Sequence, residues 1–476
     1  MRFSRIFAIN ALMLMGCGFL MLIPAFTDIV TQKNILNPFV LSSSIALCTG
    51  LFIYLICPKE QSPLRTKEMF LTTTLMWLLY VTFSALPFYL PPHAMSLADA
   101  FFEAMSGLTG TGATILTDLE NETSGTLLWR SISQWMGGMG IVVVALVVLP
   151  KLQIGGMQLF STESSTLPER ISPTMRQSIR DILVYFVVLS CLCCFCLWAA
   201  GMSLFDAINH AMTTLSTGGF STHDQSIGYF HSPAIEWTLI VFMIMGGLPL
   251  VLGPYVFFKK WDLIKNNVQI GTFFKTLLVA TLLLIPVVGP EKMRTILFQT
   301  VSILTTTGFV TTNYASWGIF ACTLFLFLTA CGACSGSTSG SIKMFRFAII
   351  GRLLSAKMKG LVKPYAVFIP RYGNRTIDAE IISSVLFFLS LFFLTFVIST
   401  LSLTALGLDF LTALSGTLSC IANVGPALGD IIGPDKTYTT LPDAAKWILS
   451  FVMLAGRLEF TSIVVLFLPF LWRKNT

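Results

Sequence analysis

Four short stretches of the sequence are rich in glycine and small polar residues, and each lies between two apolar segments. The stretches are Thr109, Gly110, Thr111 and Gly112; Ser216, Thr217, Gly218 and Gly219; Thr305, Thr306, Thr307 and Gly308; and Ala422, Asn423, Val424 and Gly425. Glycine permits backbone angles that direct carbonyl groups to one side, and hydroxyl side chains add further oxygen atoms. None of these residues is charged. Uncharged oxygen atoms suit a monovalent cation better than calcium, which usually takes carboxylates.

The first two stretches belong to a longer internal repeat. Residues 95–114 (MSLADAFFEAMSGLTGTGAT) match residues 202–221 (MSLFDAINHAMTTLSTGGFS) at many positions, including the final glycines Gly112 and Gly219. The copies that end at Gly308 and Gly425 are looser. Repeats are the first feature to establish in a sequence. The chain therefore reads as four units, each with an apolar span, a short helix, a glycine-containing loop and a second span.

The elements that position these loops are predicted to be membrane-spanning helices. The chain has 476 residues, of which 54% are apolar and 11% charged, whereas soluble domains have about 25% charged residues. This composition excludes a soluble multidomain protein, a disordered chain and a small disulfide scaffold. Ten apolar stretches reach the length of about 20 residues that a spanning helix needs. They lie near 6–29, 36–57, 69–90, 127–149, 182–201, 235–258, 272–289, 316–355, 381–406 and 444–471.

The short helix before each loop is too brief to cross a bilayer, which suggests a re-entrant element. Ser96 with Asp99, and Ser203 with Asp206, have the spacing of a capping box and predict where two of these helices begin. Irregular backbone within a membrane is tolerated where it lines a cavity. Four such loops around one axis would form a ring of carbonyl oxygens that replaces the hydration shell of a cation. The alternative is four ordinary turns at helix ends.

Lysine and arginine crowd into alternate connections between the apolar stretches. The opposite side receives only Lys33, Lys292, Arg294, Lys436 and Lys446. The positive-inside rule therefore predicts that both termini are cytoplasmic. The net charge of +7 follows from this topology and does not indicate nucleic-acid binding.

The segment 331–343 (CGACSGSTSGSIK) interrupts the apolar stretch 316–355 with glycine and small polar residues. Broken helices at mid-membrane are where transport proteins place sites and gates; the alternative is a passive kink. Arg457 lies about halfway along the last apolar stretch, where a lone charge must face a cavity or a partner. The alternative for Arg457 is a structural pair with an acid such as Glu103. A structural role is predicted for Arg130, which lies nearer the end of its span.

These loops, together with LLWRSISQWMGGMG at 127–140, CSGSTSGSIK at 334–343 and LAGRLEF at 454–460, resemble the Trk/Ktr/HKT superfamily of potassium transporters. The additional N-terminal pair of spans resembles the bacterial TrkH/TrkG type. The resemblance implies an all-α fold with four units of two spans (M1 and M2) around a pore helix (P), assembled about one pore. The implied divisions are 1–68, an N-terminal two-helix extension; 69–150, 178–260, 270–356 and 378–473, the four pore repeats; and 331–343, an intramembrane gating loop.

The resemblance also assigns roles to residues. The four loops would bind potassium as a selectivity filter, and a glycine in every repeat (Gly112, Gly219, Gly308 and Gly425) goes with potassium preference. The gate would comprise Cys334, Ser335, Gly336, Ser337, Thr338, Ser339, Gly340, Ser341, Lys343 and Arg457. The sequence departs from the usual pattern at Gly110, Cys331 and Ser341, which could alter selectivity or gating.

Partners are also implied by the resemblance. It predicts a homodimer in a bacterial cytoplasmic membrane and a separate cytosolic ring of RCK-type (TrkA-like) subunits that binds ATP, ADP or NADH. No cofactor is expected in this chain itself, and no enzyme activity. The alternatives are a sodium-permeable or ion-coupled symporter of the same fold, an organic-solute transporter and a membrane-embedded enzyme. Solute transporters usually show two inverted halves, and an enzyme would need clustered histidines or carboxylates in one cavity.

Overall fold

The computed structural model describes residues 3–32, 37–57, 65–147, 175–257, 267–373 and 375–469. Most of this part of the chain is helical. The first half contains α1 (Phe3–Gln32), α2 (Pro38–Ile56), α3 (Thr66–Ser84), α4 (Leu86–Tyr89), α5 (Leu97–Thr109), α6 (Ser124–Val147), α8 (Met175–Ala199), α9 (Leu204–Leu215), α10 (Pro233–Gly247) and α11 (Gly253–Phe257). The second half contains α13 (Val268–Val288), α14 (Met293–Leu304), α15 (Ile319–Cys331), α16 (Met344–Val362), α17 (Ala379–Ala405), α18 (Phe410–Ala422), α19 (Asp443–Arg457) and α20 (Thr461–Phe467).

Short elements complete the connections. The 3-10 turns are η1 (Leu119–Asn121), η3 (Ser226–Phe230), η4 (Leu250–Leu252), η5 (Pro290–Lys292) and η6 (Tyr314–Trp317). A small antiparallel hairpin pairs β1 (Arg371–Tyr372) with β2 (Arg375–Thr376). Within the described residues, this hairpin is the sole departure from the predicted all-helical fold.

Six stretches of the described chain are long and apolar enough to cross a membrane, which is fewer than the ten predicted spans. They are Phe3–Thr31, Pro38–Ile56, Lys67–Tyr89, Ile179–Ala199, Val268–Val288 and Ala379–Ala405. Three other predicted spans contain helices that stop early: α10 at Gly247, α15 at Cys331 and α19 at Arg457. Hydropathy records the apolar composition of such a segment but not the interruption of its helix, which accounts for three of the four spans by which the two counts differ. The fourth, 127–149, contains α6 and extends beyond the described residues.

The helices around the four loops pack in a closed cycle. The helix that follows each loop packs against the short helix of the next unit: α6 against α9, α10 against α14, α15 against α18, and α19 against α5. The last contact joins the end of the chain to its first third. This cycle is what brings four loops that are far apart in the sequence to one axis.

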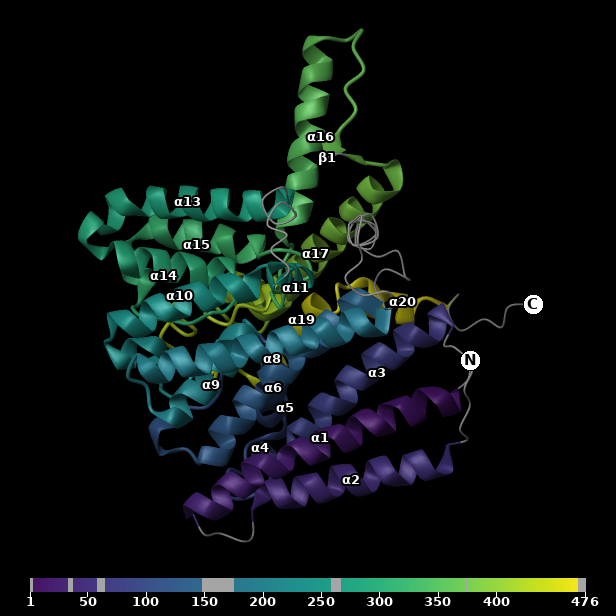
Figure 1. Cartoon of the computed structure of the whole chain (residues 1–476), viewed down its shortest axis with the longest axis vertical. Helices are drawn as coiled ribbons and strands as arrows, with labels where there is room; N and C mark the ends of the chain where they lie inside the picture. Colours follow the sequence, from purple (N-terminus) through teal and green to yellow (C-terminus); the bar gives the residue numbers. More distant parts are fainter. Residues whose placement is uncertain are drawn as a thin grey trace.

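The N-terminal pair α1 and α2 lies outside this cycle, at the lower edge in Figure 1, where α1 packs against α3 and α6. Its link to α6 is polar. The carboxylate of Asp28 accepts hydrogen bonds from the backbone N of Gly125 at 2.5 Å and from the hydroxyl of Thr123 at 3.2 Å. Because the first N–H groups of a helix have no partner within it, α1 supplies the cap for α6.

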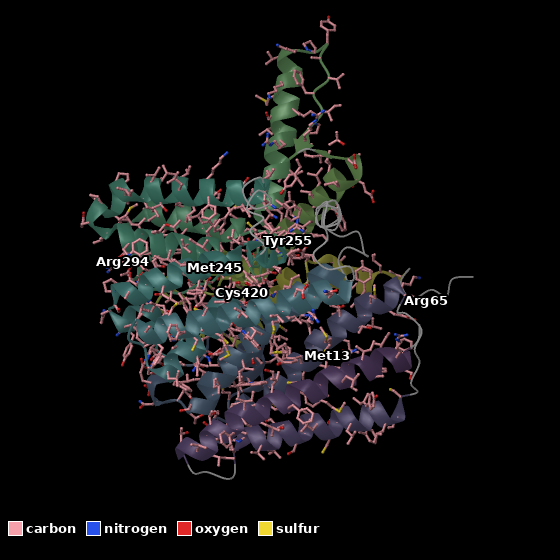
Figure 2. The ribbon with its side chains drawn as sticks, in the orientation of Figure 1. Met13, Arg65, Met245, Tyr255, Arg294 and Cys420 are labelled. Atoms are coloured by element: carbon pink, nitrogen blue, oxygen red, sulfur yellow. The ribbon has the colours of Figure 1, made fainter. Side chains whose placement is uncertain are left out.

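The outer surface of the helices is apolar, as contact with lipid requires. Phe26 of α1 is 68% exposed, Phe195 of α8 60% and Phe393 of α17 66%. Figure 2 shows Arg65 and Arg294 at opposite edges of the bundle, with Cys420 of α18 between them. In Figure 1, α16 projects away from the other helices, with the β1–β2 hairpin beside it. Its first residues, including Phe345 and Ile349, are buried.

Candidate cation site and gate

Each of the four short helices ends in the same turn. The second loop residue adopts a left-handed conformation in every case, with φ of 66° at Gly110, 50° at Thr217, 58° at Thr306 and 55° at Asn423. The third loop residue donates its backbone N–H to the helix five residues earlier, as Thr111 does to Ser106 and Val424 to Ser419. This is the 6→1 bond with which many helices end. Four loops of different sequence therefore share one backbone structure.

This turn gives a reason for Gly110, one of the three departures from the usual pattern. Left-handed φ costs a residue with a side chain roughly 1–2 kcal/mol, whereas glycine adopts it freely. A Cβ added to Gly110 would lie 3.5 Å from Nη2 of Arg457. The first loop is thus the one whose left-handed position has no side chain, and the Arg457 guanidinium lies beside it.

The four predicted glycines form a closed ring with the carbonyl groups of neighbouring loops. A Cβ added to Gly112 would lie 2.2 Å from O of Gly218, and one added to Gly219 would lie 1.9 Å from O of Thr307. The cycle continues with Gly308 to Val424 O at 2.0 Å and Gly425 to Thr111 O at 2.5 Å. All four glycines have left-handed φ, between 77° and 100°. Only glycine allows this approach, which brings four backbone carbonyls around one axis.

The side chains of the loops divide into two groups. The hydroxyls of Thr109, Ser216 and Thr305 donate back to carbonyls of their own helices, at 2.7–2.8 Å. The hydroxyl of Thr111 lies 2.7 Å from that of Thr109 and accepts from Nδ2 of Asn423 at 3.0 Å. The structure thus brings all four predicted loops together, and the first residue of three loops serves to end its helix.

A cavity of about 660 Å³ opens on the side of the ring where the loops leave it. It is lined by the four glycines and by charged groups that include Arg130, Asp224, Asp430, Asp435 and Lys436. Acidic groups at the mouth of a narrow pathway raise the local cation concentration. The cavity is therefore a suitable approach to the ring for a hydrated cation.

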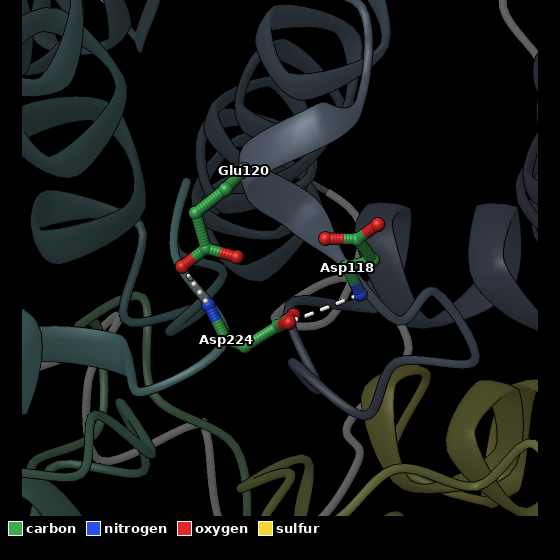
Figure 3. A group of neighbouring side chains, drawn as sticks. All are labelled: Asp118, Glu120 and Asp224. Atoms are coloured by element: carbon green, nitrogen blue, oxygen red, sulfur yellow. Dashed lines mark hydrogen bonds between the residues drawn. The ribbon is translucent and has the colours of Figure 1, made fainter.

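Asp118, Glu120 and Asp224 lie close together at the edge of this cavity (Figure 3). The Asp224 carboxylate accepts from the backbone N of Asp118 at 3.0 Å and of Leu119 at 3.1 Å, and the backbone N of Asp224 donates to Glu120 at 3.2 Å. These bonds join the loop before α6 to the loop before α10. The cluster therefore connects the first two units through backbone groups.

Asp206, at the start of α9, is a second charged group of this outer region. Its pKa would be raised by burial, but the nearby His223 ring and hydrogen bonds from Ser203 and Thr222, both at 2.7 Å, outweigh burial and hold the pKa well below its usual range. The Ser203 hydroxyl caps α9 by accepting a hydrogen bond from the backbone N of Asp206 at 3.0 Å, and Ser96 caps α5 in the same way, accepting from Asp99 N at 3.1 Å. The two predicted helix starts are confirmed.

Beneath the ring, the interruption between α15 and α16 forms a buried loop across the axis. Thr338 donates to the carbonyl of Leu215 at 2.9 Å, and the backbone N of Gly340 donates to the hydroxyl of Thr306 at 3.0 Å. A Cβ on Gly340 would lie 2.4 Å from the carbonyl O of Ala422. The loop thus contacts the helix ends of the second, third and fourth units at once.

Ser341 and Lys343 hold this loop in a constrained form. Both adopt left-handed φ, of 67° and 72°. The Ser341 hydroxyl donates to the carbonyls of Thr329 at 3.0 Å and Ala330 at 2.5 Å, at the end of α15. Cys331 is the last residue of α15 and its carbonyl accepts from Lys343 N at 3.0 Å. The departures Cys331 and Ser341 are therefore both compatible with the loop.

Arg457, the last residue of α19, reaches this loop from the fourth unit. Its Nη1 donates to the carbonyl of Thr338 at 2.8 Å and its Nη2 to that of Gly137 at 3.3 Å. The side chain is buried, and no carboxylate in the described part of the chain pairs with it. Arg457 is thus a buried cation held by backbone carbonyls.

Glu103 is not the partner of Arg457, so that alternative is wrong. Glu103 pairs with Arg130 instead, with Oε1 2.8 Å from Nε, which gives Arg130 the structural role expected for it. Glu459 pairs with Arg346 at 2.6 Å and lies 3.5 Å from Lys343 Nζ. Lys343, the last residue of the loop 331–343, is therefore connected through Glu459 to the chain that follows α19.

Two residues of the site have no signal in the loop sequences. Gln134 of α6 donates from Nε2 to the carbonyl of Gly218 at 2.7 Å and accepts from the backbone N of Phe220 at 3.1 Å. The Tyr438 hydroxyl donates to the carbonyl of Gly425 at 2.8 Å. Gln134 could have been noticed as an amide within an apolar span, whereas Tyr438 lies in a connection and could not.

The fold and the site together define a polytopic helical membrane protein with four equivalent loops around one uncharged, oxygen-lined axis. A profile of the TrkH family, described as a cation transport protein, matches residues 32–288 and 262–474. The chain therefore belongs to the TrkH family, which confirms the resemblance seen in its sequence.

Relatives match over the full length. The Trk system potassium uptake protein TrkI of Halomonas elongata is 38% identical, over 99% of this chain and 98% of its own length. The Trk system potassium uptake protein TrkH of Escherichia coli is 35% identical over 100% of both chains. The crystal structure of the potassium transporter TrkH from Vibrio parahaemolyticus matches with a TM-score of 0.91 at 32% identity, covering 99% of this chain and 100% of that one.

Proposed function

We propose that this chain is the pore-forming subunit of a Trk-type potassium uptake system, and that potassium crosses the ring formed by the four loops. The glycine–carbonyl cycle carries this proposal. It places four uncharged carbonyls around one axis, the arrangement that substitutes for water around potassium. The named relatives are potassium uptake proteins, and a transporter rather than an enzyme is what their family implies.

The test is growth at low external potassium of a bacterium that lacks its own uptake systems, with this chain and an RCK ring supplied. We expect rescue by the natural chain and none by Gly112→Ser or Gly219→Ser, because a side chain at either position meets a carbonyl of the next loop. The matched control is Gly140→Ala, since a Cβ there has nothing within 4 Å. Equal rescue by the two filter variants would reject the proposal. Sodium flux in liposomes would then test the alternative of a sodium-permeable or ion-coupled symporter.

We propose further that the loop 331–343 and Arg457 form the gate below the filter. The loop contacts three of the four helix ends and Arg457 donates to its Thr338 carbonyl, so an ion cannot pass until these contacts change. We expect Arg457→Ala to raise the potassium leak of liposomes that contain this chain but no RCK-type ring. The matched control is Arg352→Ala, which removes an exposed arginine of α16. A leak no larger than that of the control would contradict the role of Arg457.

The remaining architecture follows the same family pattern. We propose ten spans, with the extension 1–68 outside four M1–P–M2 repeats, and both termini on the cytoplasmic side of the bacterial inner membrane. Labelling of introduced cysteines from either side of the membrane tests this topology. We expect cysteines that replace Lys33 and Lys436 to be labelled from outside. The subunit would work as a homodimer, which chemical cross-linking in membranes tests.

Regulation would come from the cytosolic RCK-type ring, which binds the nucleotide. Lys357, Lys359 and Lys363 are exposed on or next to α16, the helix that projects from the bundle (Figure 1). We propose that this basic face contacts an acidic patch of the ring. Replacing the three lysines with glutamate should weaken co-purification of the ring, and more so at low salt, because surface charges are screened over about 10 Å at 0.1 M. Undiminished binding would reject this contact.

A further inference from the structure

A second set of contacts lies near the four glycines, between each short helix and the chain that follows its loop. Glu103, His210, Gln299 and Gly416 precede Gly112, Gly219, Gly308 and Gly425 by the same number of residues. The repeats thus present one position on each short helix to the chain that follows its own glycine. The glycines are alike, whereas this position holds four different residues.

Each short helix is hydrogen-bonded to the segment of chain that follows its loop, and these hydrogen bonds are called ties below. Glu103 accepts from the backbone N of Ile115 at 2.9 Å and from the hydroxyl of Thr114 at 3.0 Å. In the second unit, Nε2 of His210 lies 3.0 Å from the hydroxyl of Ser221.

The other two units use an amide and a serine. Gln299 donates to the hydroxyl of Thr311 at 3.2 Å. In the fourth unit, Ile432 occupies the space beside Gly416, and the neighbouring Ser415 exchanges hydrogen bonds with Leu428 N and O at 3.0 and 2.7 Å. A polar tie between helix and departing chain is therefore present in all four units.

The ties of the first two units are joined by Arg130. Its Nε donates to Glu103 at 2.8 Å, its Nη2 to the hydroxyl of Thr114 at 3.1 Å, and its Nη1 to the carbonyl of Ser221 at 2.9 Å. Its guanidinium also lies 4.1 Å from the ring centre of Phe220. A planar guanidinium with several fixed donors is suited to hold groups at set distances. Here it spans from the first loop to the second.

The hydrogen bonds of His210 show which proton it carries. Its Nδ1 lies 2.8 Å from the carbonyl O of Asp206, which can only accept. Nδ1 therefore carries the hydrogen, and Nε2 accepts from the hydroxyl of Ser221. Ser221 is thus held twice, through its carbonyl by Arg130 and through its hydroxyl by His210.

We propose that Glu103, His210, Gln299 and Ser415 form an outer ring that sets the spacing of the filter loops, and that the Arg130 bridge makes the junction of units one and two decisive for cation selectivity. These are positioning residues, because they act through the departing chain and not on the ion. This inference rests on the proposed filter. Selectivity depends on the number and placement of carbonyls, and the Arg130 contacts join the chain that leaves the first loop to the chain that leaves the second.

Mild and strong variants test the proposal in liposomes that contain the full chain, with the potassium-to-sodium permeability ratio as the readout. Ser221→Ala removes the hydrogen bond to His210, and Thr114→Val removes the hydrogen bonds to Glu103 and Arg130, each with little change in volume. We expect Ser221→Ala to lower the ratio about fivefold and Thr114→Val to lower it at least as much, since one hydrogen bond contributes roughly 1 kcal/mol and 1.4 kcal/mol is a factor of ten. Glu103→Gln and Arg130→Gln should each lower it further, and the double variant no further than either single variant, because paired groups act as a unit.

The matched control is the ion pair of Arg294 and Glu236, which lies away from the filter. Its Nε and Oε2 atoms are 2.7 Å apart. Arg294→Gln should leave the permeability ratio unchanged. A ratio unchanged in Ser221→Ala and Thr114→Val, with normal protein yield, would overturn the proposal even if the stronger variants fail to fold. If Gly219→Ser abolishes uptake while these two have no effect, only this inference fails. If Gly219→Ser has no effect either, the filter itself is misassigned.

Discussion

Replacing Gly219 with alanine should cost this protein its cation selectivity while leaving it able to fold. The added Cβ would lie 1.9 Å from the carbonyl O of Thr307, and real Cβ contacts essentially never fall below 3.0 Å. The carbonyl or the loop must therefore move by about 1 Å. Overpacking of this kind costs roughly 1–3 kcal/mol, and the left-handed φ of 77° adds roughly 1–2 kcal/mol for alanine.

Part of this cost would fall on the proposed ion site, because the carbonyl that must move is one of the four in the ring. A loss of roughly 1.4–2.8 kcal/mol in potassium coordination would lower the potassium-to-sodium permeability ratio about 10- to 100-fold. The ratio is measured from reversal potentials or paired tracer fluxes in liposomes. Gly425→Ala should have a smaller effect, since its Cβ would lie 2.5 Å from the Thr111 carbonyl.

Gly140→Ala is the control, because it adds the same methyl group to α6 where no atom lies within 4 Å. It should retain both flux and selectivity. Wild-type selectivity in Gly219→Ala, at normal protein yield, would show that the ring is either not the ion site or moves freely. The geometric reasoning would then be refuted.

Three further predictions concern other parts of the fold. Asp28→Ala should lower thermal stability in detergent by roughly 1–3 kcal/mol because it leaves Gly125 N and Thr123 without their partner, whereas Thr31→Ala at an exposed site should not; equal melting temperatures would contradict the capping role. Ser341→Gly removes two hydrogen bonds and relieves the strain of a left-handed φ, so potassium leak in the absence of the RCK-type ring should rise, whereas Ser341→Ala should mainly reduce stability. No added leak in Ser341→Gly would argue against the loop as a barrier. Because the pKa of Asp206 is depressed in the fold, its carboxylate stabilises the fold above the ordinary pKa of about 3.9, and this stabilisation is lost as the pH falls toward the folded pKa. The Asp206→Asn variant should therefore melt at a lower temperature than the natural chain at pH 7, and the difference should shrink in acid. A difference in melting temperature that does not depend on pH would reject this prediction.

Local sequence signals were sufficient to predict the loops and the helix starts. Glycine and hydroxyl residues recur at fixed places between apolar segments, and Ser96 and Ser203 mark where α5 and α9 begin. Such signals act over a few residues, so they are readable without a structure. The interruption at 331–343 was visible for the same reason, because glycine and small polar residues rarely continue a helix in an apolar stretch.

Features that depend on distant parts of the chain could not be predicted. The break after α19 places Glu459 and Phe460 at left-handed φ, although neither is glycine and Gly456 just before the break is itself helical. Thr217 and Thr306 also take left-handed φ, although threonine does not favour it. The sequence leaves both Arg130 and Arg457 open as partners of Glu103, and only the packing of α5 against α6 selects Arg130.

The buried charges also show why Arg457 differs from the others in its role. Charges within a membrane are costly unless they are paired or face water, and four buried basic groups have carboxylate partners: Arg130 with Glu103, Arg346 and Lys343 with Glu459, and Lys446 with Asp99. Such pairs have a structural role, and removing one partner is destabilising because it leaves the other charge buried and unpaired. Among the described residues, Arg457 has only carbonyl oxygens as hydrogen-bond partners, which are the ligands that the proposed filter offers to potassium. In the proposed gate, a guanidinium held in this way would take the place of a cation on the pathway, and we expect its position to be sensitive to whether an ion is present.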